Sequence, residues 1–273
     1  MEKAINYGGT NLVFADNGKG NPIVLLHGYL ESQEIWYSFA EKLKKNGHRL
    51  ITLDLPGHGL SGVKGDTHSM EFQAGAVLAV LNDLKIEKCV LVGHSMGGYV
   101  ALTFAKNFSE RLAGLCLFHS TPNPDSDEKR ASREREIELV KGGKIELIAK
   151  TNISLAFARE NHKKLEEQIE EATIIAMETE PDGIIACLRG MQSRPDTNDM
   201  LKKLKLPVLL IFGKKDSYIP EEVAQAMAQH FSQHQTVFLE NSGHMGFIEE
   251  EAKSLELISA FAEKAFAQIV TGN

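Results

Sequence analysis

The chain has 273 residues, of which 42% are hydrophobic and 25% charged, and it contains 23 glycines and 8 prolines. This ordinary globular composition excludes a disordered, collagen-like or disulfide-stapled protein, and the length allows one large domain or a domain with an insertion. The formal net charge of −7 gives no general attraction to phosphate backbones or anionic lipids, so neither nucleic acid nor a membrane surface is an expected partner.

The N-terminus reads Met-Glu-Lys-Ala-Ile-Asn and lacks the apolar core of a signal peptide. No apolar run approaches the roughly 18 residues that are needed to cross a bilayer. We therefore expect a cytoplasmic protein. The three cysteines, Cys89, Cys116 and Cys187, show no C-x-x-C spacing, and two of them lie in apolar runs, which favours buried, unreactive thiols over a redox or metal role.

Eight short β-rich segments alternate with longer segments of helical period, which predicts a mostly parallel sheet covered by helices. The first two are joined by Gly-Gly-Thr-Asn, a candidate hairpin turn. The other six are continuous apolar runs, as expected of strands that are buried on both faces. The predicted strands are residues 3–7, 12–15, 23–26, 50–53, 89–92, 115–118, 208–212 and 236–239.

Helical spacing appears between and after these strands. Four apolar residues within residues 74–81 fall on one helical face, and five more within residues 255–269 do the same near the C-terminus. These segments are typical of helices that pack one apolar face against a sheet.

A long stretch from about Ser120 to Leu206 has no strand pattern. It opens with a turn-rich linker, and seven of the nine residues at 128–136 are charged with mixed signs, which we interpret as a solvated helix face. Two amphipathic helices follow, within residues 165–176 and 184–191. We therefore expect a core of residues 1–119 and 206–273, with residues 120–205 inserted as a helical cap.

Residues 93–97 read Gly-His-Ser-Met-Gly, a Gly-x-Ser-x-Gly pattern that is weak without its context. Here it follows a predicted buried strand and leads into a segment of helical character. A sharp strand-to-helix turn needs small neighbours, and Gly93 and Gly97 supply them. Such a turn would lift the Ser95 hydroxyl clear of the sheet, which makes Ser95 the candidate nucleophile.

A serine nucleophile needs a base, and the base needs an acid that orients it. Asp216 and His244 each follow the carboxyl end of a predicted buried strand, as Ser95 does, and this common edge is where parallel sheets place their ligand sites. His244 is therefore the candidate base and Asp216 the candidate acid. Asp54 and Asp125 also follow strands and are the alternative acids, although Asp54 begins a turn-forming sequence that suits a loop-fixing role.

Acyl transfer also requires two hydrogen-bond donors for the developing oxyanion. The backbone amide of Met96, directly after the nucleophile, is one candidate. The turn after residues 23–26 reads His27-Gly28-Tyr29 and offers the Tyr29 amide as the other. In this interpretation His27 braces the turn and is not itself catalytic.

Together these segments resemble the α/β-hydrolase superfamily. The resemblance covers nearly the whole chain: the turn at 27–29 and residues 54–59, 93–97, 213–216 and 242–244. It implies an eight-stranded, mostly parallel, doubly wound sheet with an α-helical cap inserted between the sixth and seventh strands. The sequence Gly-His-Ser-Met-Gly-Gly is similar to esterase, lactonase, C–C bond hydrolase and haloperoxidase-like members. Dehalogenases and epoxide hydrolases differ, because they have an aspartate in place of the serine.

The resemblance and the site residues together predict a serine hydrolase that cleaves a small-molecule carboxylic ester through an acyl-enzyme. Lactonase, C–C bond hydrolase and perhydrolase or haloperoxidase-like activities can use the same triad and remain open. A hydrolase-like ligand receptor is the alternative outside enzymes, and an intact triad argues against it. No H-E-x-x-H motif or cysteine cluster is present, and we expect neither a metal nor a cofactor.

The substrate pocket is expected to be largely apolar and to take a small, mostly uncharged ester or related carbonyl compound. Phe157, Leu188 and Met191 in the cap could face Ser95, or could instead pack the cap helices together. Arg194 could bind a substrate carboxylate or form a surface ion pair. Residues that adjoin motif residues or follow a strand are further candidates: Tyr29, Trp36, His119, Ile219 and Met245.

Overall fold

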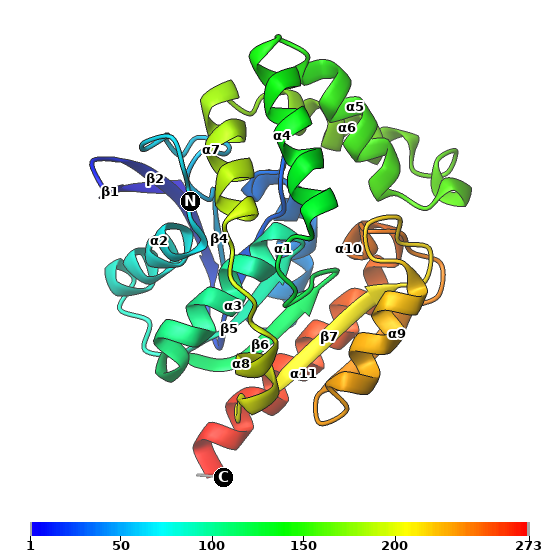
Figure 1. The fold of residues 1–273 in the computed structure, drawn as a ribbon. Helices are drawn as coiled ribbons and strands as arrows, with labels where there is room; N and C mark the ends of the chain where they lie inside the picture. Colours follow the sequence, from blue (N-terminus) through cyan, green and yellow to red (C-terminus); the bar gives the residue numbers. More distant parts are fainter. Residues whose placement is uncertain (1, 272–273) are drawn as a thin grey trace.

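The computed structural model describes residues 2–271, which form an eight-stranded sheet in the order β1-β2-β4-β3-β5-β6-β7-β8. Strand β2 runs antiparallel to β1 and β4, and the other neighbouring strands are parallel (Figure 1). All eight predicted strands are present. Their bounds are β1 (Glu2–Tyr7), β2 (Thr10–Gly18), β3 (Pro22–Leu26), β4 (Arg49–Leu53), β5 (Cys89–His94), β6 (Leu112–Phe118), β7 (Val208–Gly213) and β8 (Gln235–Leu239).

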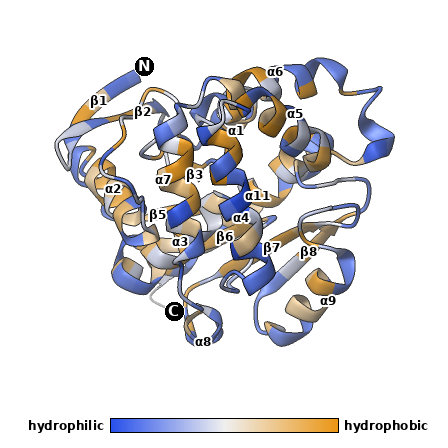
Figure 2. Cartoon of the chain, turned by 45° about the horizontal axis from the view of Figure 1, so that its top comes forward, coloured by the Kyte–Doolittle hydropathy of each residue, from blue (hydrophilic) through white to orange (hydrophobic). Residues whose placement is uncertain are grey.

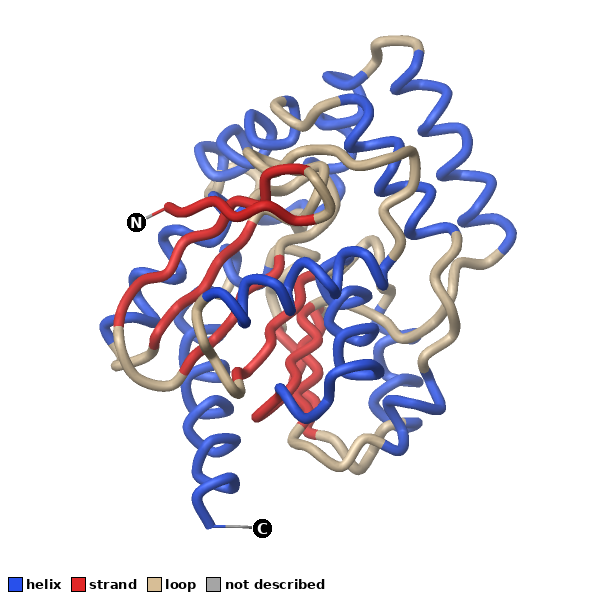
Figure 3. Tube along the Cα trace, turned by 90° about the vertical axis from the view of Figure 1, so that its left-hand side faces the viewer, coloured by secondary structure: helices blue, strands red, loops and turns tan. Residues whose placement is uncertain are grey.

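Helices cover both faces of the sheet. Helices α2 (Met70–Asp83) and α3 (Met96–Phe108) pack together on one face, whereas α1 (Tyr37–Lys45) and α11 (Glu251–Thr271) pack together on the other (Figure 1). Figure 3 shows from the side that the strands lie between helices. Because β5, β6 and β7 are covered on both faces, every residue in them is buried, which explains why their sequences are continuous apolar runs.

Between β6 and β7 the described chain is helical and contains no strand. Figure 1 shows α4 to α7 gathered at the top of the molecule, beyond the arrowheads of the central strands. The two amphipathic helices predicted in this stretch are present as α6 and α7. The helices are α4 (Asp127–Lys141), α5 (Ile145–Ala156), α6 (Glu166–Met177), α7 (Pro181–Gln192) and α8 (Asn198–Lys203).

Local sequence explains where several helices begin. Ser69 precedes α2, and its hydroxyl accepts a hydrogen bond from the Phe72 amide; Ser126 does the same for the Lys129 amide at the start of α4. Figure 2 shows hydrophobic residues along the central strands and hydrophilic residues on the outer turns of the helices. Among the described residues, no helix is both long and apolar enough to cross a membrane.

The interpretation of residues 128–136 as a solvated helix face is wrong for one side of α4. Arg133 is buried, and its guanidinium forms an ion pair with the buried carboxylate of Asp125, 2.5 Å from Nε to Oδ2. Arg194 pairs with the other oxygen of Asp125, also at 2.5 Å, so it is not in a surface ion pair. A buried charge is tolerated when an opposite charge pairs with it. Here the opposite charge belongs to Asp125, which lies outside α4, so the sequence of the helix alone does not reveal it.

Candidate active site

Ser95 lies in a strained turn between β5 and α3. Its φ of 50° and ψ of −115° are unusual for a residue with a side chain. A Cβ on Gly93 would lie 2.4 Å from the Gly97 carbonyl oxygen, and one on Gly97 would lie 2.6 Å from the Leu26 carbonyl oxygen. Backbone segments therefore approach so closely around this turn that only glycine fits at positions 93 and 97.

Asp216 and His244, from the turns after β7 and β8, form a hydrogen bond in which Nδ1 lies 2.8 Å from Oδ2. The other carboxylate oxygen, Oδ1, accepts hydrogen bonds from the amides of Tyr218 and Ile219 at 2.7 and 3.0 Å. Burial would raise the pKa of Asp216, but the facing rings of His244 and His119 bring this pKa well below its usual range. Asp216 is thus an ionised carboxylate whose contact with His244 is made at Nδ1 and not at Nε2.

Ser95 and His244 line the same cavity, whose volume is about 660 Å³. The helices between β6 and β7 contribute much of the lining. Of the residues proposed from sequence for the oxyanion site or the pocket, five are part of this lining: Tyr29, His119, Met191, Arg194 and Ile219.

The lining of this cavity does not include Trp36, Phe157, Leu188 or Met245, which were also candidates for the pocket. All four are almost fully buried in the hydrophobic core instead. The ring of Trp36 packs on Phe247 with 4.2 Å between centroids. Adjacency to a motif residue is a poor guide, because neighbouring side chains in the chain point in different directions.

The cavity is more polar than the sequence suggested. Lys129, Arg133 and Glu136 line it from α4, spaced at i, i+4 and i+7 on one helix face. Glu136 accepts hydrogen bonds from the Tyr29 hydroxyl and from the side-chain amide of Asn152, both at 3.1 Å. The ring of Tyr218 lies over that of His244, with 4.9 Å between centroids. The sequence reveals the helical spacing of these three charged residues, but their charge predicts a face exposed to solvent and not one that lines a cavity.

The turn after β3 presents the Tyr29 amide, which donates no hydrogen bond within residues 2–271. Met96 is the first residue of α3, so its amide has no carbonyl partner within the helix. His27 braces the turn, as expected: its Nδ1 donates to the Gly28 carbonyl at 2.8 Å, and its Nε2 accepts from the Leu55 amide at 2.9 Å. Two amides are therefore placed as candidate oxyanion donors.

The two alternative acids have other partners. Asp54 accepts hydrogen bonds from the amides of Gln33 and Leu60, at 2.8 and 3.0 Å, and so holds a loop. The carboxylate of Asp125 forms ion pairs with Arg133 and Arg194. Among the described residues, neither carboxylate is hydrogen-bonded to His244.

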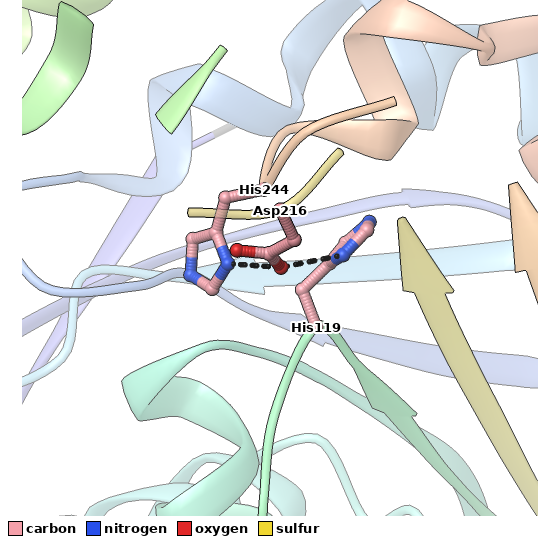
Figure 4. A group of neighbouring side chains, drawn as sticks. All are labelled: His119, Asp216 and His244. Carbon is pink, nitrogen blue, oxygen red and sulfur yellow. Dashed lines mark hydrogen bonds and ion pairs between the residues drawn. The ribbon is translucent and has the colours of Figure 1, made fainter. Parts of the chain in front are cut away.

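His119 lies on the opposite side of Asp216 from His244 (Figure 4). Its Nδ1 lies 3.2 Å from Oδ2 of Asp216, the same oxygen that His244 contacts. One ligand atom from each of the three residues falls within 4.8 Å of the others, a spacing that a metal ion could also bridge. Hydrogen bonds already link these atoms, which gives the cluster a role without a metal. The sequence predicts His119 at the pocket but carries no signal for its contact with Asp216.

Comparison with known proteins identifies the family. A family model for the alpha/beta hydrolase fold matches residues 21–251. A solved structure of a thermophilic esterase from Thermogutta terrifontis, with malate bound, is 32% identical, covers 97% of this chain and 99% of its own, and has a TM-score of 0.91. An esterase structure from Exiguobacterium antarcticum is 25% identical and has a TM-score of 0.85. The match covers 93% of this chain and 96% of that one.

A curated relative, the pimeloyl-[acyl-carrier protein] methyl ester esterase of Vibrio campbellii, is 27% identical over 91% of this chain and 97% of its own length. The matched family region includes the strands and turns that carry Ser95, Asp216 and His244. The chain therefore belongs to the alpha/beta hydrolase fold family and is a hydrolase.

Proposed function

We propose that this hydrolase cleaves a small-molecule carboxylic ester through an acyl-enzyme, with Ser95 as nucleophile, His244 as general base and Asp216 as the orienting acid. The observation that carries the proposal is the hydrogen bond from His244 to Asp216, beside a cavity that Ser95 also lines. The names of the relatives support an ester as substrate, since they include esterases and monoacylglycerol lipases.

In the first step the Ser95 hydroxyl oxygen attacks the ester carbonyl while Nε2 of His244 takes its proton. Asp216 favours the charged imidazolium that forms, because its carboxylate stays ionised. His244 then returns the proton to the leaving alkoxide. The products of this step are the alcohol and an acyl group bound to Ser95.

In the second step His244 removes a proton from water, and the hydroxide attacks the acyl carbonyl. Collapse of this intermediate releases the carboxylic acid and returns the proton to Ser95. In both steps the Tyr29 and Met96 amides would bind the oxyanion. Donors held in place by a turn and a helix start need no reorganisation as the charge develops.

We further propose that residues 120–205 act as a cap that selects the substrate. The support is that α4 and α7 place Lys129, Arg133, Glu136 and Met191 in the lining of the cavity. A cavity of about 660 Å³ suits a small ester. Its mixture of apolar and ion-paired groups favours substrates that carry a polar group besides the ester.

The proposal is tested by steady-state hydrolysis of p-nitrophenyl acetate, followed by a panel of esters and lactones with and without hydrogen peroxide. We expect S95A to lose at least about 10⁴-fold in kcat. The matched control S38A, which removes an exposed hydroxyl on α1, should keep wild-type activity. Wild-type turnover by S95A would exclude the mechanism, and labelling by a fluorophosphonate without turnover of any ester would favour a receptor.

A further inference from the structure

His119 is an unusual residue at the end of β6. It is fully buried, and its φ of 49° places a side-chain-bearing residue in the left-handed region. Its ring stacks on Phe118 with 5.0 Å between centroids and meets the carboxylate of Asp216 edge-on (Figure 4). Strained backbone of this kind persists only where surrounding contacts hold it.

The contacts of the ring define its protonation. Nε2 faces the Gly246 amide at 3.3 Å, and an amide only donates, so Nε2 must be the acceptor. Nδ1 faces the Asp216 carboxylate at 3.2 Å, and a carboxylate only accepts, so this contact requires a proton on Nδ1. The Gly213 amide also points at Nδ1, at 3.1 Å, and is the one contact that this form leaves unmade, whereas the form protonated on Nε2 would leave the contacts with Asp216 and Gly246 unmade. His119 is therefore a neutral imidazole that donates to Asp216.

We infer that His119 is a positioning residue that shares the Asp216 carboxylate with His244 and so extends the activity of the enzyme to lower pH. The inference rests on the proposed function, because it assigns His119 a role through the proposed acid and base. By donating to Oδ2, His119 draws negative charge away from the side of the carboxylate that faces His244. A positive charge opposite that side of the carboxylate is then stabilised less, so we expect the acid limb of the activity at lower pH than it would have without His119.

Two histidines on one carboxylate can have different roles because their surroundings differ. Burial lowers the pKa of His119 to about 4, against the opposite effect of Asp216, so His119 stays neutral. Both histidines line the cavity, but the side chain of His244 is 7% exposed whereas that of His119 is fully buried. The other titratable groups that face this cluster are His94, 6.2 Å from His119 and 5.0 Å from His244 between ring centroids, its partner Glu31, and Tyr218 over His244.

His119 also ties together the turns that carry the candidate triad. Its ring contacts Gly213, where the turn to Asp216 begins, and Gly246, two residues after His244. The next residue, Ser120, donates from its hydroxyl to the Ser95 carbonyl at 2.7 Å. A purely structural role for His119 is thus the competing explanation, and the experiment must separate the two.

The test is the pH dependence of kcat/KM for p-nitrophenyl acetate in the wild type, H119L and H119N. H119L removes the donor, so its acid limb should move to higher pH by about half to one unit, which is less than the full effect of a lost hydrogen bond to a charged group because His119 acts through Asp216. In H119N the side-chain amide replaces the Nδ1 donor, so the profile should return toward that of the wild type. H48L, which removes a buried histidine bonded to Ser259, is the control and should leave the acid limb in place.

A lower kcat in H119L with an unmoved acid limb would overturn the inference and leave a structural role. If H119L does not fold, ¹⁵N NMR of the wild-type histidines gives an independent result: His119 should be neutral and protonated on Nδ1 at pH 6, and an imidazolium there would overturn the inference. Full activity of S95A would instead show that the proposed function itself is wrong, so the two failures are distinguishable.

Discussion

Glu31 and His94 form a buried ion pair in which Oε2 of the carboxylate lies 3.0 Å from Nδ1 of the ring. The same oxygen accepts a hydrogen bond from the Gly28 amide at 2.6 Å. Nε2 of His94 faces the backbone carbonyl of His244 at 2.9 Å, so both ring nitrogens must carry protons. The pair therefore joins the turn before Tyr29 to the loop that holds His244.

The ion pair predicts a pH-dependent contribution to stability. Burial would raise the pKa of Glu31, but His94 brings it below its usual 4.5; burial would lower the pKa of His94, but Glu31 brings it above its usual 6.5. The contribution of Glu31 is lost as the pH falls through its lowered pKa, and that of His94 is lost as the pH rises through its raised pKa. The pair is fully effective between about pH 4.5 and 6.5.

E31Q should therefore be less stable than the wild type by about 2 kcal/mol in this window, as for the loss of a hydrogen bond to a charged group. The difference should shrink at alkaline pH, where His94 loses its proton in the wild type as well. Denaturant unfolding of both proteins from pH 5 to 9 measures it. A difference that does not change with pH would contradict the assignment of His94 as an imidazolium.

Asp216 and Asp125 offer a matched pair of Asp-to-Asn changes. D216N should lose roughly 10⁴-fold in kcat while remaining folded, since asparagine cannot hold His244 in the tautomer that accepts a proton on Nε2. D125N should mainly lose stability, because it leaves two buried guanidinium groups short of a carboxylate. Kinetics and thermal unfolding of both variants measure this. If D125N instead loses the activity and D216N keeps it, the acid has been assigned to the wrong residue.

Gly28 tests the oxyanion turn. A Cβ at this position would lie 2.9 Å from Nδ1 of His94 and 3.0 Å from Oε2 of Glu31, so G28A must shift the turn that carries the Tyr29 amide. We expect kcat to fall on the order of 100-fold, the usual effect of losing one oxyanion donor, with little change in KM. G142A, where a Cβ meets nothing closer than 3.4 Å, is the control. Equal kcat values for G28A and the wild type would exclude the Tyr29 amide as a donor.

Met191 and Leu188 lie one turn apart on α7, and only Met191 lines the cavity. M191A should enlarge the cavity and shift the preferred acyl chain of p-nitrophenyl esters to a greater length. L188A should leave the chain-length preference unchanged and cost about 2–5 kcal/mol of stability, because it opens a void in the core. The measurements are the rates of hydrolysis of p-nitrophenyl esters of increasing acyl length and the unfolding free energy of each variant. If only L188A changed the preferred acyl length, Leu188 and not Met191 would be the residue that lines the pocket.

Much of the fold was predictable because its signals are local. Continuous apolar runs mark buried strands, and the serine between Gly93 and Gly97 marks a tight turn whichever way the rest of the chain folds. Asp216 and His244 each follow a predicted parallel strand, so the sequence predicts both at the same edge of the sheet. In the structure Oδ2 of Asp216 lies 2.8 Å from Nδ1 of His244. The assignment of catalytic roles to these residues remains a prediction.

What the tertiary structure alone decided is which side chains meet from distant segments. Sequence placed Trp36 in the pocket and the charged side of α4 in solvent, whereas Trp36 packs in the core and Arg133 is buried against Asp125. His119 and Asp216 follow different strands, and only the parallel pairing of β6 with β7 brings them to one edge of the sheet. The physical reason is the distance along the chain over which each effect acts. Residue propensity and hydrophobic periodicity determine local structure over a few residues, whereas the position of a buried polar side chain depends on hydrogen-bonding and ion-pairing partners that are far away in the sequence.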